Sequence, residues 1–346
     1  MIRVLVVDDS AFMRKAIKTM LDKDPDIEVI DVAKNGEEGL EKIRELDPDV
    51  VTLDIEMPRM DGLTALRHIM MELPRPVLMI SSLTTEGGES TLKAMELGAV
   101  DYIPKQLSKV SLDIVRIEED LRSKVKIIAR QKFTPPKGVK RKKPAPIKKI
   151  KPQGKQVRDL IAIGVSTGGP PAVQRVLSVL DSDFPASIVI AQHMPAAFTG
   201  PFAKRLNECC KIEVLEAKSG DRLKNGVAFI APGGKHLVLH QQTTHVELEI
   251  TDKPKEAIYR PSADVLISSA AQAIGKRCLG DILTGMGKDG LEGVRLLRSK
   301  GGITLAQSEA SCVVYGMPKS VVDAGLADEV VHIDDMAEAL QYRLFN

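Results

Sequence analysis

The stretch LIAIGVSTGGPP, residues 160–171, decides how the second half of this chain folds. An apolar run ends at Val165, and two glycines and two prolines follow Ser166. This order predicts a buried strand, a sharp turn and the start of a helix. The turn would hold the Ser166 hydroxyl at the carboxyl edge of a sheet, where glycine lets a carbonyl group approach closely. A serine nucleophile is one interpretation; a phosphate-binding loop and a plain turn are the alternatives.

Alternating apolar runs after this stretch predict a parallel sheet with helices between its strands. The further runs are residues 187–191, 227–230, 279–283 and 303–306. Two of them precede polar residues: His193 in AQHMP and Asp289 in LTGMGKDG. Three strands of one sheet would bring Ser166, His193 and Asp289 to a single edge. A serine, an imidazole to take its proton and a carboxylate to orient the imidazole form an activated nucleophile.

The order of these three residues separates the chain from ordinary lipases and esterases. Residues 164–168 satisfy the G-x-S-x-G pattern of the α/β-hydrolases, but those enzymes place the acid before the histidine. The backbone N–H groups near Thr167 and Met286 are the candidates for an oxyanion hole.

The other histidines are weaker candidates. His236, His240 and His245 alternate through an expected hairpin without a carboxylate at metal-ligand spacing, which argues against zinc. His68 and His332 are expected to be surface or packing residues.

The first half of the chain predicts a second doubly wound parallel sheet. Strands are expected at residues 2–7, 29–32, 50–54, 76–80 and 99–103, with helices at 12–21 and 37–46. Polar residues follow the strand ends, where such sheets bind ligands: Asp8, Asp9, Asp54, Ser81 and Lys105.

Three carboxylates at one sheet edge repel one another unless a cation lies among them. Oxygen ligands with room for water suit Mg²⁺. Asp54 would then attack a phosphoryl group whose oxygens are neutralised by the metal, Lys105 and the Ser81 hydroxyl. Helix capping explains one of these aspartates, but not three carboxylates with a lysine.

A basic segment divides the two halves. Residues 131–155 contain ten Lys or Arg, five prolines and no acid, so the rest of the +2 chain carries a net charge of −8. Charge repulsion and proline predict an extended linker. A nucleic-acid or membrane patch is the alternative, but Phe133 is its single aromatic residue and no amphipathic pattern is present. The predicted domains are residues 1–124 and 156–346, with a linker over 125–155.

Composition places the chain among globular proteins. Hydrophobic residues make up 43% of its 346 residues, no apolar stretch is long enough to span a membrane, and no signal peptide precedes the first strand. The four cysteines form no C-x-x-C pair, which is typical of reduced thiols. We therefore expect a cytoplasmic protein.

The first half resembles a response-regulator receiver domain. The resemblance covers residues 1–124 and rests on VVDDS, TLDIEMPRMDG, SS at 81–82 and DYIPK. It implies the flavodoxin-like strand order and makes Asp54 the phospho-acceptor. Asp8, Asp9, Asp54 and the Glu56 carbonyl would hold Mg²⁺, and Ser81 and Tyr102 would be switch residues. The phosphodonor would be a phosphohistidine on a chemotaxis kinase.

The second half resembles the catalytic domain of the CheB family of protein-glutamate methylesterases. The motifs that carry the resemblance are IAIGVSTGGP, AQHMP, SGDRLKNGVAFIAPGGKHLVL, RPSADVL, LTGMGKDG and AQSEASCVVYGMPKSVV. It implies that Ser166 is the nucleophile, His193 the base and Asp289 its orienter. Tyr259 departs from the family, which commonly has histidine there.

Together the two resemblances imply a phosphorylation-activated hydrolase of glutamate γ-methyl esters on methyl-accepting chemotaxis receptors. Methanol would be released without a cofactor for the esterase step, and the same acyl-enzyme could serve glutamine deamidation. The resemblance implies that the unphosphorylated receiver restricts access to the catalytic cleft. The enzyme would bind no nucleic acid and would reach the membrane only through receptors. The alternative is a phosphorylation-controlled DNA-binding regulator, against which residues 156–346 show no helix-turn-helix pattern.

Overall fold

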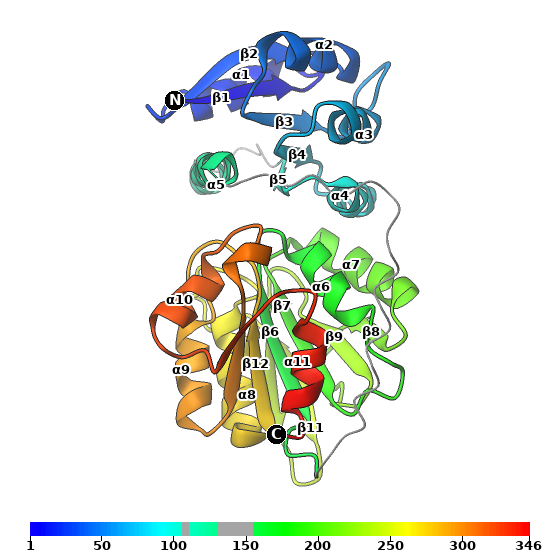
Figure 1. Ribbon diagram of the computed structural model, residues 1–346, viewed down its shortest axis with the longest axis vertical. Helices are drawn as coiled ribbons and strands as arrows, with labels where there is room; N and C mark the ends of the chain where they lie inside the picture. The colour runs from blue at the N-terminus through cyan, green and yellow to red at the C-terminus, as the bar shows by residue number, and fades with distance from the viewer. Residues whose placement is uncertain (106–110, 131–154) are drawn as a thin grey trace. The chain divides into compact units, whose positions relative to one another are not determined.

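The chain forms two compact units, residues 1–141 and 142–346. The computed structural model describes residues 1–105, 111–130 and 155–346 (Figure 1). Most of the expected linker, residues 131–154, lies outside the described part. Helix α5 (Ser111–Arg130) occupies the first residues of the segment expected to be linker.

The N-terminal unit contains a five-stranded parallel sheet in the order β2-β1-β3-β4-β5. Its strands are β1 (Ile2–Val7), β2 (Ile27–Ala33), β3 (Val50–Asp54), β4 (Val77–Ser81) and β5 (Asp101–Pro104). Helices α1 (Ala11–Leu21) and α5 cover one face, and α2 (Gly36–Leu46), α3 (Gly62–Glu72) and α4 (Thr85–Leu97) cover the other (Figure 1). The doubly wound parallel sheet that the sequence predicts for the first half of the chain is therefore confirmed.

Polar caps fix where the helices of this unit begin. The side chains of Ser10, Asn35, Asp61 and Thr84 each accept a hydrogen bond from a backbone N–H in the first turn of the following helix. The inner strands β3 and β4 are buried on both faces, as expected for a sheet covered by two helix layers.

The C-terminal unit contains a seven-stranded parallel sheet in the order β14-β13-β12-β6-β7-β9-β8. Its strands are β6 (Leu160–Val165), β7 (Ser187–Gln192), β8 (Glu213–Glu216), β9 (Val227–Ile230), β12 (Cys278–Ile282), β13 (Ile303–Gln307) and β14 (Glu329–Val331). Strands β10 (His236–Gln241) and β11 (Val246–Thr251) form a separate antiparallel pair. The predictions of a second parallel α/β domain and of a hairpin are confirmed.

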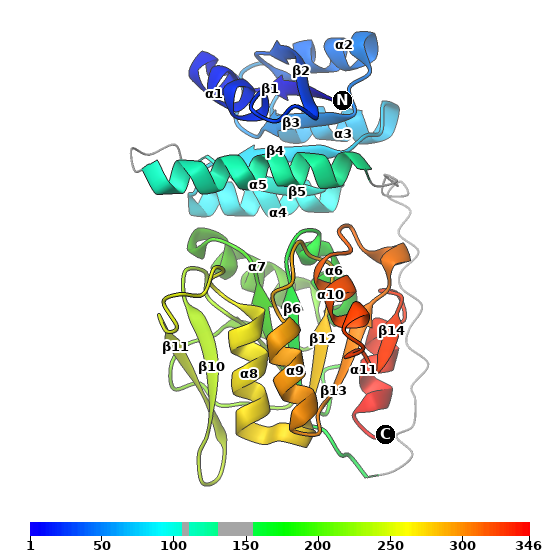
Figure 2. The same cartoon turned by 90° about the vertical axis from the view of Figure 1, so that its left-hand side faces the viewer.

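Helices cover both faces of this sheet. Helices α8 (Ala263–Ile274), α9 (Leu291–Ser299) and α10 (Met317–Asp323) share one apolar cluster with the strands. Helices α6 (Gly169–Leu177), α7 (Ala196–Cys209) and α11 (Met336–Arg343) lie on the opposite face (Figures 1 and 2). Among the described residues, no helix combines the length and apolar composition that crossing a membrane requires.

In each sheet the chain continues to the other side of the first strand part-way through the order. Strand β6 pairs with β7 on one side and with β12 on the other, and β1 likewise lies between β2 and β3. Ligand sites of open parallel sheets lie at the carboxyl ends of strands beside such a change of side. Ser166 follows β6, and Asp8 follows β1.

Candidate active site

The turn after β6 presents Ser166 at the sheet edge. The Ser166 N–H donates to the Thr284 carbonyl at 3.0 Å, which ties the turn to the segment after β12. Gly168 adopts φ +75°, and a side chain there would collide with Val313. A Cβ on Gly285 would lie 2.8 Å from the Ser166 Cβ. The glycines therefore let the two segments approach closely around the serine.

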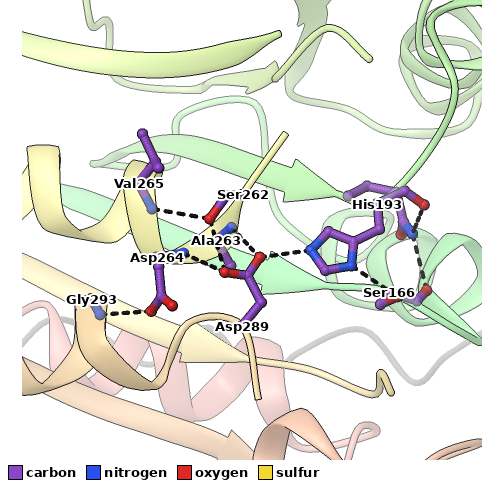
Figure 3. Close-up of polar contacts among 9 residues, drawn as sticks. Ser166, His193, Ser262, Ala263, Asp264, Val265, Asp289 and Gly293 are labelled. Carbon is purple, nitrogen blue, oxygen red and sulfur yellow. Dashed lines mark hydrogen bonds and ion pairs between the residues drawn. The ribbon is translucent and has the colours of Figure 1, made fainter. Parts of the chain in front are cut away.

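His193 joins Ser166 to Asp289 (Figure 3). Its Nδ1 lies 3.1 Å from the Ser166 Oγ, and its Nε2 lies 2.7 Å from the Asp289 Oδ2. The three residues lie in the segments that follow the adjacent strands β12, β6 and β7. The structure thus brings together the three side chains singled out from the sequence, at hydrogen-bonding distance and in the order that proton transfer requires.

Asp289 lies against the amino terminus of helix α8 (Figure 3). Its Oδ1 accepts from the Ser262 hydroxyl at 2.8 Å and from the Asp264 N–H at 3.1 Å, and its Oδ2 accepts from the Ala263 N–H at 2.6 Å. Burial by itself would raise the pKa of Asp289, but the bonds from His193 and the backbone N–H groups outweigh it and lower the pKa. Asp289 is therefore held ionised beside the imidazole.

Asp264 is a second carboxyl close to Asp289. Burial raises its pKa to about 6, and the neighbouring Asp289 charge adds to this effect, although the Gly293 N–H opposes it. The two environments move the pKa values of these carboxyls in opposite directions, so Asp289 ionises before Asp264 as the pH rises.

Two backbone N–H groups lie in the turns beside the Ser166 hydroxyl. Neither the Thr167 N–H nor the Met286 N–H donates to any acceptor among the described residues. Thr167 is buried and Met286 half-buried. Both N–H groups are therefore available to bind a ligand oxygen.

An acidic cluster lies at the carboxyl edge of the N-terminal sheet. One carboxylate oxygen from each of Asp8, Asp9 and Asp54 lies within 4.8 Å of the others. Lys105 forms ion pairs with Asp54 at 2.6 Å and with Asp8 at 3.1 Å. Burial raises the pKa of Asp54 to about 6; Asp8 adds to this and Lys105 opposes it. Glu56 is exposed, and its N–H lies 3.4 Å from the Asp54 Oδ1.

The expected switch residues both point into the N-terminal unit. Ser81 is buried, and its hydroxyl accepts from Thr91 at 2.6 Å and donates to the Gly87 carbonyl at 3.2 Å. Tyr102 is buried beneath Lys124, whose ammonium lies 5.4 Å from the ring centroid. The Ser81 hydroxyl is thus bonded to helix α4.

Comparison with known proteins decides the family. The CheB methylesterase family model matches residues 161–340, and the response regulator receiver domain model matches residues 4–115. A protein-glutamate methylesterase/protein-glutamine glutaminase from Nitratidesulfovibrio vulgaris is 62% identical over 369 residues, which covers all of both chains. The chain belongs to the CheB methylesterase family. Both resemblances seen in the sequence are confirmed, and the chain is a hydrolase that carries a receiver domain.

Two further relatives extend this comparison. The Lawsonia intracellularis protein of the same name is 55% identical over 356 residues, again covering both chains completely. The crystal structure of the Thermotoga maritima CheB methylesterase catalytic domain is 38% identical with a TM-score of 0.52, covering 53% of this chain and 97% of that one. The C-terminal unit of this CheB family member therefore has a relative whose catalytic domain was crystallised on its own.

Several residues that support the site were not singled out from the sequence. Ser262 caps helix α8 and donates to Asp289. The Gln192 amide donates to the Ser166 carbonyl at 3.0 Å, and the Thr284 hydroxyl donates to the Thr167 carbonyl at 2.9 Å. A capping serine before an apolar run was the one available signal, because the other two contacts join distant segments.

The remaining histidines are not part of the hydrogen bonds that join Ser166, His193 and Asp289. His240 lies 2.7 Å from Glu249 across the hairpin, and His236 is fully buried. His68 lies 2.8 Å from Glu72 on helix α3, and His332 is exposed. The four cysteines are free thiols.

Proposed function

We propose that this protein hydrolyses γ-methyl esters of glutamate side chains on methyl-accepting chemotaxis receptors. The observation that carries the proposal is the continuous series of hydrogen bonds from Ser166 through His193 to Asp289. The Ser166 Oγ lies 3.1 Å from the His193 Nδ1, and the His193 Nε2 lies 2.7 Å from the Asp289 Oδ2. The names of the full-length relatives support the substrate class.

In this mechanism Ser166 is the nucleophile. Its oxygen attacks the ester carbonyl while His193 takes the hydroxyl proton at Nδ1. The imidazolium returns that proton to the departing methoxide, which leaves as methanol. A water molecule then attacks the glutamyl-enzyme with His193 again as base, releasing the glutamate carboxylate and free Ser166.

Asp289 and the two unpaired N–H groups stabilise the charges that develop during these steps. Asp289 holds the Nε2–H of His193 and stabilises the imidazolium that forms. The N–H groups of Thr167 and Met286 bind the oxyanion of the tetrahedral intermediate, and losing one such donor typically costs about 10²–10³ in rate.

Glutamine deamidation is a second reaction of the same site. The relatives carry glutaminase in their names, and the acyl-enzyme is identical for an ester and an amide. The difference lies in the leaving group, because ammonia must leave with the proton that His193 supplies.

The receiver domain would regulate this activity through Asp54. The donor would be a phosphohistidine on a chemotaxis kinase, and the enzyme would act in the cytoplasm, reaching membranes only through receptors and binding no nucleic acid. Asp8, Asp9 and Asp54 fit Mg²⁺, because each offers a carboxylate oxygen within 4.8 Å of the others, and the Lys105 ammonium already pairs with the buried Oδ2 atoms of Asp8 and Asp54 as a cation would. Mg²⁺ would be held there with the Glu56 carbonyl and would neutralise phosphoryl charge. Lys105 lies where it would pair with the same charge.

Methanol release from methylated receptor tests the proposal. Full-length protein is assayed with and without a small-molecule phosphodonor, beside the Ser166→Ala variant. Serine-dependent methanol release supports the proposal. A protein that folds but releases no methanol in either condition would contradict it.

A phosphorylation-controlled nucleic-acid-binding protein is the competing function. Retention on nucleic acid that disappears when residues 131–155 are deleted would favour that alternative. The Ser166–His193–Asp289 geometry has no role in such a protein.

A further inference from the structure

Tyr259 covers one face of the His193 imidazole. The ring centroids lie 4.1 Å apart and the ring planes differ by 12°, so the two rings are stacked in parallel. No step of the proposed hydrolysis assigns a role to this contact.

The stack adds a restraint to those that the hydrogen bonds supply. The bonds to Ser166 and Asp289 both lie near the plane of the imidazole and fix its two nitrogens. The ring is also attached to its backbone through Cγ, so it can tilt only by rotation about the Cβ–Cγ bond, which strains both hydrogen bonds. The parallel ring of Tyr259 blocks that tilt on one side.

The segment that carries Tyr259 is itself anchored at the site. The carbonyl of the next residue, Arg260, accepts from the Gly234 N–H at 3.0 Å. Three residues after the tyrosine, Ser262 donates to Asp289 and caps helix α8. One short segment therefore holds both the imidazole and the carboxylate that orients it.

Tyr259 also reaches the turn of the candidate oxyanion hole. Its hydroxyl lies 3.4 Å from the position that a Cβ on Gly287 would occupy, next to Met286. The ring thus spans the distance from the base to this turn, and its rigid plane has few ways to move away.

We propose that Tyr259 is a positioning residue that acts through His193. It keeps the imidazole in the plane where Nδ1 meets the Ser166 hydroxyl, and its π face stabilises the imidazolium that forms as Ser166 loses its proton. The reaction in which this matters is the proposed ester hydrolysis, and in that respect the inference rests on the proposed function.

The test compares Tyr259→Phe with Tyr259→Leu in the full-length protein. Phenylalanine keeps the ring and removes the hydroxyl, whereas leucine keeps an apolar cover without a π face. We expect the Phe variant to retain kcat within about twofold, and the Leu variant to lose about three- to 30-fold in kcat with KM little changed. A Leu variant as active as wild type would overturn the inference, as would a Phe variant that loses as much as Leu.

A measurement independent of turnover accompanies these kinetics. The Nε2–H proton of His193 is followed by NMR in wild type, Tyr259→Phe and Tyr259→Leu. Loss of order of the imidazole should broaden this resonance and speed its exchange with water only in the Leu variant. An unchanged resonance in that variant would overturn the positioning role.

The two measurements separate failure of the inference from failure of the proposed function. If wild type releases no methanol, the proposed function fails and the NMR signal alone decides the role of Tyr259. Thermal unfolding of each variant shows whether it is folded, and Tyr259→Met replaces the Leu variant if that one unfolds.

Discussion

His193 presents its Nδ1 atom, not its Nε2 atom, to the hydroxyl of Ser166 at 3.1 Å. In the serine-protease triad the two nitrogens have the opposite partners, with Nε2 toward the serine. A neutral His193 must therefore carry its proton on Nε2, where Asp289 accepts it at 2.7 Å, so that Nδ1 offers a lone pair to the serine. The imidazole therefore keeps the same two roles, base toward serine and donor toward aspartate, with its two nitrogens exchanged.

Replacing Ser166 with alanine should abolish methanol release and leave the fold intact. The side chain is small and half-buried at a turn, so its loss creates little cavity, whereas its oxygen makes the covalent bond. Turnover and thermal unfolding are measured beside Ser182→Ala, an exposed serine that precedes β7, whereas His193 follows that strand. More than a few per cent of residual turnover would remove Ser166 from its assigned role.

Asp289→Asn should lower turnover by about three to four decades, as in other triads. It should also lower the unfolding temperature, because Asp289 accepts from Ser262, Ala263 and Asp264 as well as from His193. Either amide orientation of asparagine turns an NH₂ group toward one of these donors.

Asp264→Asn is the matched control for this variant. Asp264 lies one residue beyond Ala263 at the same helix start, and its raised pKa of about 6 makes loss of its charge less costly. We expect this control to lose less than tenfold in turnover. An Asp289→Asn variant that loses no more than its control would mean that His193 needs no carboxylate.

The sequence was sufficient for most strands of both sheets and for locating the three residues of the candidate triad. Apolar runs such as Leu160–Val165 and Val227–Ile230 are buried along their whole length, so their hydrophobic pattern alone locates them. Parallel topology then brings the residues after β6, β7 and β12 to one edge.

The remaining features depend on contacts between distant residues or on weak local patterns. Strand β8 (Glu213–Glu216) lies at the edge of its sheet with one buried residue, so it lacks an apolar run. The roles of Gln192 and Thr284 arise from their contacts with the Ser166 turn. The orientation of the His193 ring follows from where Asp289 is held, which no spacing in the sequence reveals.

Asp281 should make the protein less stable as the pH rises above the acidic range. This residue is fully buried in the central strand β12, and neither carboxyl oxygen has a hydrogen-bond partner among the described residues. Burial raises its pKa well above the ordinary value of 3.8. The unfolded chain loses this proton near that ordinary value, whereas the folded protein retains it to a much higher pH.

Folding therefore takes up a proton at Asp281 between those two pKa values. The free energy of unfolding should fall by about 1.4 kcal/mol per pH unit in this window, relative to a variant without the group. Urea unfolding at pH 5, 6 and 7 compares wild type with Asp281→Asn and with the exposed control Asp183→Asn. Parallel pH profiles for wild type and Asp281→Asn would show that Asp281 does not keep its proton in the folded state.

The last prediction concerns control of the esterase by the receiver domain. We expect phosphodonor with Mg²⁺ to activate full-length protein and to leave Asp54→Ala unchanged. Alanine removes the phospho-acceptor, while Lys105 keeps its ion pair with Asp8 at 3.1 Å, so the variant should fold. A coupling of about 1–3 kcal/mol between the domains corresponds to 5- to 150-fold activation.

Two mechanisms of control make opposite predictions for the catalytic unit alone. The isolated Thermotoga maritima catalytic domain was crystallised, so a fragment of residues 150–346 should fold without the receiver. If the unphosphorylated receiver restricts access to Ser166, this fragment should exceed the basal activity of the full-length protein. If the receiver instead activates the catalytic unit by contact, the fragment should be no more active than the unphosphorylated whole. Methanol release by the fragment, with its Ser166→Ala variant as background, distinguishes the two, because only removal of a restraint raises activity without a phosphodonor.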